Sequence, residues 1–230
     1  MAKTSTSQLL DDQSLAQLIE ECGRAGQAVC GVDEAGRGAL AGPVVAAAAI
    51  LRAGAQMPIG VDDSKKLTAK RRATLFDALH GTTNVGVGVV EHDVIDQVNI
   101  RQANYMAMAS AVEHLVAQPG LKPIGAVIVD GNDLTGHFIE TMRRLRLHAF
   151  MLVKGESRVK EIAAASIVAK VTRDRRMAEE HVRHPGYGFD GNAGYGSDAH
   201  LSALTALGPC AIHRLTFAPV AALKQQALAF

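Results

Sequence analysis

The chain has 230 residues, of which 48% are apolar and 20% charged, and its net charge of +1 neither requires nor excludes a polyanionic partner. Its three cysteines are odd in number and lack zinc-type spacing, which argues against a disulfide framework. No apolar run is long enough to cross a bilayer and the first residues do not resemble a signal peptide, so we expect a soluble cytoplasmic protein that contacts no membrane.

The first half of the chain predicts two helices and three strands. Residues 1–13 are polar and predict a disordered tail, whereas residues 14–230 predict a single domain that begins with a helix over about 14–21. Thr68 can cap a second helix, which ends at Gly81. Apolar runs and alternation predict strands over 28–32, 44–51 and 82–90.

The second half alternates helices with strands. Apolar runs predict two more strands, over 124–129 and 148–153. Caps and apolar periodicity predict helices over 99–117, 134–146, 159–183 and 198–207. Strands that come first and then alternate with helices predict an α/β fold, in which a mixed sheet is covered by helices on both sides.

Acidic residues follow two of the predicted strands. Asp33 and Glu34 come directly after the first strand, and Asp130 comes directly after the fourth. If the two strands are neighbours, the three carboxylates converge on one edge, where a divalent cation such as Mg²⁺ would neutralise them. Such a cluster could hydrolyse a phosphodiester by a two-metal-ion mechanism. Two unrelated solvated turns would explain the same residues.

A glycine-rich turn follows the first acidic pair. Gly36, Arg37 and Gly38 resemble the start of a dinucleotide-binding motif, but Pro43 and a strand follow where that motif needs a helix. Glycines beside an arginine also allow a sugar-phosphate backbone to approach closely, where the turn could detect a ribose 2′-hydroxyl. The alternative is a turn that needs glycine only for its dihedral angles.

Basic and aromatic residues add candidate contacts to an anionic polymer. A cationic cluster surrounds the start of the helix capped by Thr68, where the helix dipole disfavours it: Lys65, Lys66, Lys70, Arg71 and Arg72. Tyr195 lies in a glycine-rich segment, where its ring could stack on a sugar or a base. A solvated charged face and a tyrosine that covers the edge of the core are the alternatives.

Taken in order, these motifs resemble the motif series of bacterial ribonuclease HII, over roughly residues 28 to 220. The series comprises Gly31-Val32-Asp33-Glu34-Ala35-Gly36-Arg37-Gly38, Asp63-Ser64-Lys65-Lys66-Leu67, Val129-Asp130-Gly131-Asn132, Lys154-Gly155-Glu156-Ser157, the run from Ala164 to Asp174, Gly194-Tyr195-Gly196 and His213-Arg214. The resemblance implies a ribonuclease H-like fold with a central five-stranded mixed sheet, flanking helices and a helical C-terminal portion.

The resemblance also implies an activity. Enzymes of that family cut the RNA strand of RNA/DNA hybrids and cut on the 5′ side of single ribonucleotides in duplex DNA. The products carry 3′-hydroxyl and 5′-phosphate ends, and Mg²⁺ or Mn²⁺ is the cofactor. A monomer that acts in ribonucleotide excision repair and DNA replication is therefore expected. The apolar C-terminal residues Leu228 and Phe230 suggest a contact with the replication clamp.

By the same resemblance, four acidic residues are the catalytic metal ligands: Asp33, Glu34, Asp130 and Glu156. The substrate-binding residues are Gly36, Arg37, Gly38, Lys65, Lys66 and Tyr195, where the turn recognises the ribonucleotide and the tyrosine stacks on the sugar after the cut junction. Asp174 is expected to have a structural role.

This chain departs from the family pattern at two places. Glu156 stands where the family usually has aspartate, and its extra methylene would shift or weaken one metal site. Asn192-Ala193 stands where the family commonly has His-Lys, so a phosphate contact is lost, and substrate affinity would either be lower or come from Lys65 and Lys66 instead.

Two other functions are compatible with the residues. A nucleic-acid-binding protein of the same fold would bind hybrids without metal-dependent turnover, because the two departures weaken catalysis. A phosphatase with a strand-end aspartate nucleophile would need one attacking carboxylate, whereas this sequence offers a cluster.

Overall fold

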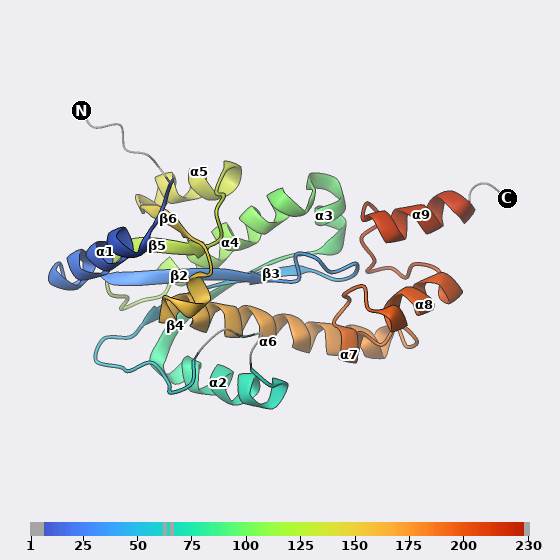
Figure 1. Cartoon of the computed structure of the whole chain (residues 1–230), viewed down its shortest axis with the longest axis horizontal. Helices are drawn as coiled ribbons and strands as arrows, with labels where there is room; N and C mark the ends of the chain where they lie inside the picture. Colours follow the sequence, from blue (N-terminus) through green and yellow to red (C-terminus); the bar gives the residue numbers. More distant parts are fainter. Residues whose placement is uncertain (1–6, 62–63, 65–66, 228–230) are drawn as a thin grey trace.

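In the computed structural model the chain forms a six-stranded mixed sheet. Helices lie on both sides of this sheet (Figure 1). The structure describes residues 7–61, 64 and 67–227. The strands lie in the order β1-β6-β5-β2-β3-β4. Their bounds are β1 Ser7–Leu9, β2 Ala28–Ala35, β3 Val44–Leu51, β4 Thr83–Val90, β5 Ile124–Asp130 and β6 Ala149–Leu152. The α/β class and the mixed sheet are confirmed, with six strands instead of the five that we expected.

The additional strand is β1, which lies inside the segment that we expected to be disordered. Ser7 pairs with Ala149 and Leu9 with Met151 in a parallel ladder, and the N–H of Leu10 continues it by donating to Met151 at 2.9 Å. An edge strand needs only backbone hydrogen bonds on one side, so a short polar segment can form one without an apolar pattern. The expectation for residues 7–13 was therefore wrong, and residues 1–6 lie outside the described part of the chain.

The two halves of the sheet differ in direction. β1, β6, β5 and β2 run parallel to one another, whereas β3 is antiparallel to both β2 and β4. Val32 of β2 lies opposite Val129 of β5. This register is central to the site, because each valine is followed by an aspartate.

The predicted helices begin and end close to the expected positions. The helices of the structure are α1 Asp12–Arg24, α2 Ala69–Thr82, α3 His92–Val98, α4 Ile100–Val116, α5 Gly136–Leu145, α6 Lys160–Arg183, α7 Phe189–Asn192, α8 Asp198–Leu207 and α9 Ala218–Ala227. A short 3₁₀ turn, η2, spans Gly155–Ser157. Thr68 and Asn99 cap α2 and α4 by accepting backbone N–H groups at 3.2 and 3.1 Å. The sequence did not predict α3, α7 and α9.

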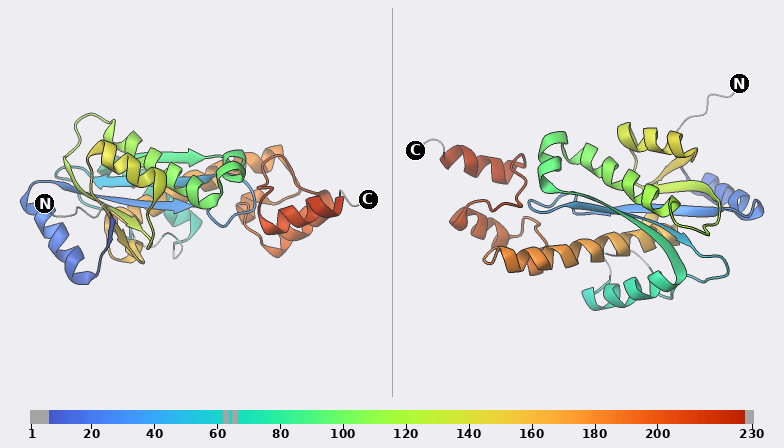
Figure 2. Two further views of the ribbon diagram at one scale, coloured as in Figure 1. Left: turned by 90° about the horizontal axis from the view of Figure 1, so that it is seen from above. Right: turned by 180° about the vertical axis from the view of Figure 1, so that it is seen from behind.

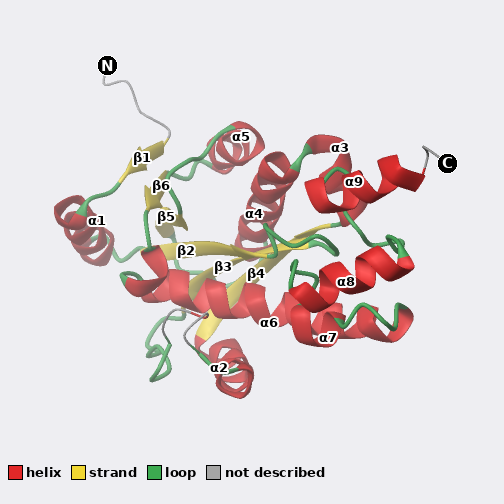
Figure 3. Cartoon of the chain, turned by 45° about the vertical axis from the view of Figure 1, so that its right-hand side comes forward, coloured by secondary structure: helices red, strands yellow, loops and turns green. Residues whose placement is uncertain are grey.

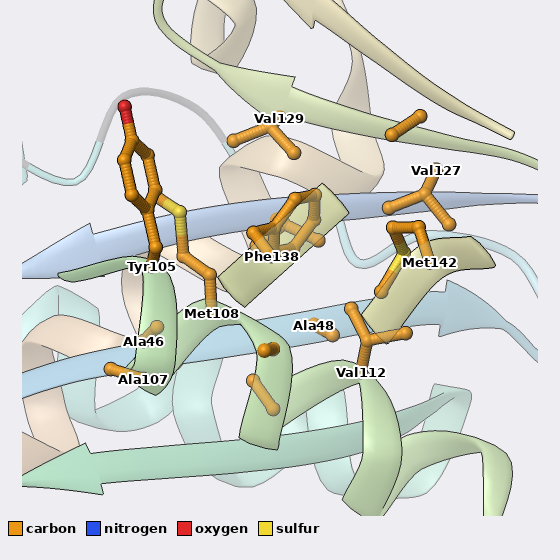
Figure 4. Close-up of a cluster of buried hydrophobic side chains, with 14 of the residues drawn as sticks. Ala46, Ala48, Tyr105, Ala107, Met108, Val112, Val127, Val129, Phe138 and Met142 are labelled. Atoms are coloured by element: carbon orange, nitrogen blue, oxygen red, sulfur yellow. The ribbon is translucent and has the colours of Figure 1, made fainter. Parts of the chain in front are cut away.

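Helices α4 and α5 cover one face of the sheet, and α1, α2 and α6 cover the other (Figure 2). Small side chains, among them Ala46, Ala48 and Ala107, pack between α4 and the sheet alongside larger ones such as Met108 (Figure 4). Gly88 shows how close this packing is, since a Cβ there would lie 2.0 Å from the carbonyl oxygen of Ala107. Small residues on both elements thus bring the helix backbone directly against the strand.

Helices α7, α8 and α9 lie beyond the end of the sheet, where α7 follows the last turns of α6 and α9 lies next to α8 (Figure 3). They are joined to the loop between β2 and β3 by an isolated bridge between Ala41 and His213. The carboxylate of Asp96 accepts the N–H groups of Leu215 and Thr216 at 2.7 and 3.0 Å. Within the described residues, no helix combines the length and apolar character that a bilayer crossing needs.

Candidate active site

The acidic residues at the C-terminal ends of β2 and β5 meet at one edge of the sheet. Because Val32 and Val129 are paired in a parallel ladder, Asp33 and Asp130 are the next residues along neighbouring strands. β2 continues to Ala35, so Asp33 belongs to the strand and not to a turn as the sequence suggested. Side chains alternate between the faces of a strand, which directs Asp33 toward α6 and the following Glu34 to the other face.

Hydrogen bonds hold the carboxylates in place. Oδ1 of Asp130 accepts the N–H of Gly155 at 2.7 Å, which connects β5 to the short turn η2. Glu156, in the same turn, accepts the hydroxyl of Ser166 of α6 at 3.1 Å. The Ser166 hydroxyl also lowers the pKa of Asp33, so one helix residue lies close to acids from two different elements.

Burial and neighbouring charge both act on Asp33, whose side chain is only 6% exposed. Desolvation and the adjacent Glu34 carboxylate raise the pKa of Asp33 well above its ordinary value, and Asp130 adds to this effect. The hydrogen bonds from Ser166 and from the backbone N–H of Glu34 oppose it only in part. A cation at this edge would relieve the repulsion.

The donor set fits a hard divalent cation, since all four acidic side chains offer carboxylate oxygens and Mg²⁺ and Mn²⁺ accept such ligands. As they stand, however, no three acidic, histidine or cysteine side chains of the described residues are arranged to hold a metal ion. Asp130 and Glu156 are each turned toward a protein donor. Binding would require these side chains to rotate toward a common point.

The glycine-rich turn after β2 is held from behind by a buried arginine. Arg214 is fully buried, and its guanidinium donates to the carbonyl oxygens of Gly36 at 2.8 Å, Arg37 at 3.0 Å and Gly42 at 3.0 Å. With these carbonyls turned inward, the side chains of the turn face outward, where Arg37 lies 4.0 Å from the Glu34 carboxylate.

A second buried arginine, Arg173 of α6, supports the same loop. It donates to the carbonyl oxygens of Pro43 at 2.9 Å, Ala41 at 3.1 Å and Ala193 at 2.8 Å. Gly36 has a φ of 91°, and a Cβ there would lie 1.9 Å from Nε of Arg173, so this position requires glycine. A Cβ at Gly38 would meet nothing within 4 Å.

Tyr195 closes the site from the C-terminal side. Its side chain is 36% exposed, and its hydroxyl accepts the N–H of Gly36 at 3.1 Å. Lys170 and Arg173 lie over its ring, at 5.6 and 5.2 Å from the centroid. Asp174 pairs with Lys170 at 2.7 Å.

One cavity gathers most of the predicted residues. Its lining includes Asp33, Glu34, Gly36, Arg37, Gly38 and Tyr195, together with Ser64, Ser166 and Lys170, which we did not predict. Glu34, Arg37 and Asp130 line a second, smaller cavity next to α4. Lys65 and Lys66 lie outside the described residues. Arg173 and Arg214 were also missed as site residues, although both occur in the quoted motif series.

Two other basic residues of the predicted cluster, Arg71 and Arg72, bind the protein itself. Arg72 donates to the carbonyl oxygens of Ser64 at 2.9 Å and Leu67 at 2.5 Å, and Arg71 donates to that of Ile59 at 2.7 Å. Their position at the start of α2 is therefore explained by the loop that precedes it, without an anionic partner.

Comparison with known proteins identifies relatives over most of the chain. The family model described as ribonuclease HII matches residues 30–220. The ribonuclease HII of Geobacter metallireducens is 52% identical over 191 residues, which cover 83% of each chain. The crystal structure of ribonuclease H2 from Pyrococcus horikoshii has a TM-score of 0.70 at 27% identity, covering 87% of this chain and 98% of that one. Ribonuclease HII from Archaeoglobus fulgidus, solved in complex with PCNA, has a TM-score of 0.68 at 25% identity. The match covers 83% of this chain and 95% of that one.

Proposed function

This chain belongs to the ribonuclease HII family, and from that premise we propose that it is an endonuclease that cuts on the 5′ side of ribonucleotides, both in RNA/DNA hybrids and singly embedded in duplex DNA. Membership of the family makes the chain a nuclease of the hydrolase class. The products would carry 3′-hydroxyl and 5′-phosphate ends. The observation that carries the proposal is the position of Asp33 and Asp130 on neighbouring parallel strands.

Four acidic residues would hold the Mg²⁺ or Mn²⁺ ions: Asp33, Glu34, Asp130 and Glu156. When bound, such ions lower the pKa of a water molecule and stabilise the departing oxygen in an in-line displacement. Ser166 would fix the orientation of Glu156, to which its hydroxyl donates at 3.1 Å, close to Asp33. The raised pKa of Asp33 supports a site that is completed by a cation.

The turn of Gly36, Arg37 and Gly38 would recognise the ribonucleotide. Gly38 supports this role, because neither its φ nor its surroundings require glycine, whereas close approach of a sugar-phosphate would. The ring of Tyr195 would stack on the sugar after the cut, next to the turn to which it is hydrogen-bonded. Lys65 and Lys66 are proposed phosphate contacts that lie outside the described residues.

A contact with the replication clamp is a further part of the proposal. The relative from Archaeoglobus fulgidus has been solved in complex with PCNA. Leu228 and Phe230, the apolar residues that suggested this contact, lie outside the described part of the chain. Loss of clamp binding when both are replaced by alanine would support the contact, and unchanged binding would contradict it.

A nicking assay tests the activity. The protein is incubated with a duplex that carries one ribonucleotide, with Mg²⁺, with Mn²⁺ and with chelator, and the ends of the products are mapped. We expect a cut on the 5′ side of the ribonucleotide with either metal and none with chelator. Binding without cutting would favour a non-catalytic binding protein, and release of phosphate from small phosphomonoesters would favour a phosphatase.

A further inference from the structure

A chain of buried hydrogen bonds runs from the C-terminal segment to Tyr195. Nδ1 of His200 lies 2.9 Å from the carbonyl oxygen of Tyr195, and Nε2 of His200 lies 3.1 Å from Nε2 of His213. Nδ1 of His213 accepts the N–H of Cys210 at 2.9 Å. All four ring nitrogens of the two histidines therefore have a partner, although the two residues are 0% and 1% exposed.

The partners determine where the protons lie. A carbonyl oxygen only accepts, so Nδ1 of His200 carries a hydrogen and its Nε2 does not. The N–H of Cys210 only donates, so Nδ1 of His213 is bare and its Nε2 carries the hydrogen. His213 thus donates to His200, and His200 donates to Tyr195, with both imidazoles neutral.

The surroundings keep His213 neutral. Burial, together with the neighbouring His200, lowers the pKa of His213 to about 4, so it carries no charge near neutral pH. Burial also raises the pKa of the Cys210 thiol, whose sulfur lies 3.1 Å from Nδ1 of His213. A thiol can donate to that bare nitrogen as the backbone N–H does.

The last acceptor in this series of hydrogen bonds is the backbone carbonyl of Tyr195, whose hydroxyl contacts the glycine-rich turn. The Tyr195 carbonyl accepts both from His200 and from the N–H of Ser197, at 2.9 and 2.8 Å. The preceding carbonyl, of Gly194, accepts the N–H of Leu40 at 2.8 Å. The backbone at Tyr195 is thereby fixed on both sides, while its hydroxyl contacts Gly36.

We propose that His200 and His213 are positioning residues, which hold Tyr195 against the glycine turn so that its ring is in place for the sugar at the cut junction. The inference rests on the proposed function of Tyr195. Two buried imidazoles cost desolvation that an apolar pair would avoid, and the same cluster already contains the rings of Tyr187 and Phe189. What the histidines add to that packing is a directed donor to Tyr195.

Four substitutions separate positioning from packing. His200→Phe keeps a ring in the cluster but removes both nitrogens, whereas His200→Asn retains an amide donor near the position of Nδ1. Tyr187→Phe is the matched control, because it removes a 2.7 Å hydrogen bond to Gly208 from the same cluster without touching Tyr195. His213→Asn gives a second route if His200→Phe does not fold, since it removes the donor to His200 and keeps an acceptor for Cys210.

The first readout needs no substrate. Hydrogen exchange at the Gly36 amide reports the bond to the Tyr195 hydroxyl, and we expect His200→Phe to speed it about tenfold. His200→Asn should restore slow exchange, and Tyr187→Phe should leave it unchanged. Equal exchange in the wild type and His200→Phe would overturn the inference. Because this measurement requires no cleavage, it remains decisive even if the proposed activity fails.

The second readout is cleavage of a duplex with one ribonucleotide. We expect His200→Phe to lower kcat/KM about tenfold in the wild-type background and to have no further effect in a Tyr195→Ala background. His213→Asn should behave in the same way as His200→Phe. An equal loss in both backgrounds would show that the histidines act other than through Tyr195, and would overturn the inference.

Discussion

Gly36 and Gly38 of the glycine-rich turn should respond differently to replacement by alanine, the first losing stability and the second losing cleavage. In Gly36→Ala the new Cβ would lie 1.9 Å from Nε of the buried Arg173, at a φ of 91°. The positive φ costs roughly 1–2 kcal/mol, and each hydrogen bond that Arg173 loses costs roughly 1.5–3 kcal/mol. The free energy of unfolding should fall by at least about 3 kcal/mol, which lowers Tm by at least about 6 °C.

In Gly38→Ala the methyl group meets nothing within 4 Å, so the free energy of unfolding should change by no more than about 0.5 kcal/mol. Its effect should appear only on substrate, where the methyl group stands in the way of the sugar-phosphate. We expect about a tenfold loss of kcat/KM on a duplex with one ribonucleotide.

Thermal unfolding and nicking assays on both variants provide the test. The expected pattern is a large loss of stability in Gly36→Ala, and unchanged stability with impaired cleavage in Gly38→Ala. If Gly38→Ala cleaves as fast as the wild type, the turn does not approach the substrate as proposed. If Gly36→Ala is as stable as the wild type, the packing of Arg173 against the turn is not as described.

Three further predictions concern the acids and the sheet. The raised pKa of Asp33 means that the folded protein favours the protonated form of this side chain. Protonated Asp33 therefore contributes its full stabilisation of the folded state below the ordinary carboxyl pKa. This contribution is lost as the pH rises through the pKa of Asp33 in the folded protein. In chelator at neutral pH, Asp33→Asn should therefore raise Tm, because it removes one of the repelling carboxylates. Each kcal/mol gained in the free energy of unfolding corresponds to about 2–4 °C in Tm. A lower Tm would contradict the repulsion between Asp33 and the neighbouring acids. Glu156→Gln should raise the Mg²⁺ concentration for half-maximal cleavage about tenfold or more, and an unchanged metal titration would remove Glu156 from the ligand set. Gly88→Ala should lower the free energy of unfolding by about 1–3 kcal/mol in denaturant titrations, because its Cβ would displace α4; full stability would show that the helix can move away without cost.

The sequence was most informative about the strands and about the acidic residues at their C-terminal ends. Apolar runs placed five strands, and the acids after two of them were expected to meet if those strands were neighbours. The pairing of Val32 with Val129 confirms that they are neighbours. No local signal could have established this pairing, since it depends on strand order across the whole sheet.

Other features could not be predicted because they depend on distant partners. β1 has no apolar alternation and exists through its backbone pairing with β6. Arg173 and Arg214 look like ordinary basic residues, but each is buried and binds carbonyls that are more than 100 positions away in the chain. Arg71 and Arg72 suggested an anionic partner, and the structure shows carbonyl oxygens of the preceding loop in that place.

The most direct test is the binding of Mn²⁺ to the protein, measured by electron paramagnetic resonance in the wild type and in Asp130→Asn. Asparagine retains the acceptor for the N–H of Gly155, so the fold should persist while one ligand charge is removed. We expect saturable Mn²⁺ binding in the wild type and an affinity weakened at least about a hundredfold in the variant. Equal binding by the two proteins would contradict a metal site at the ends of β2 and β5.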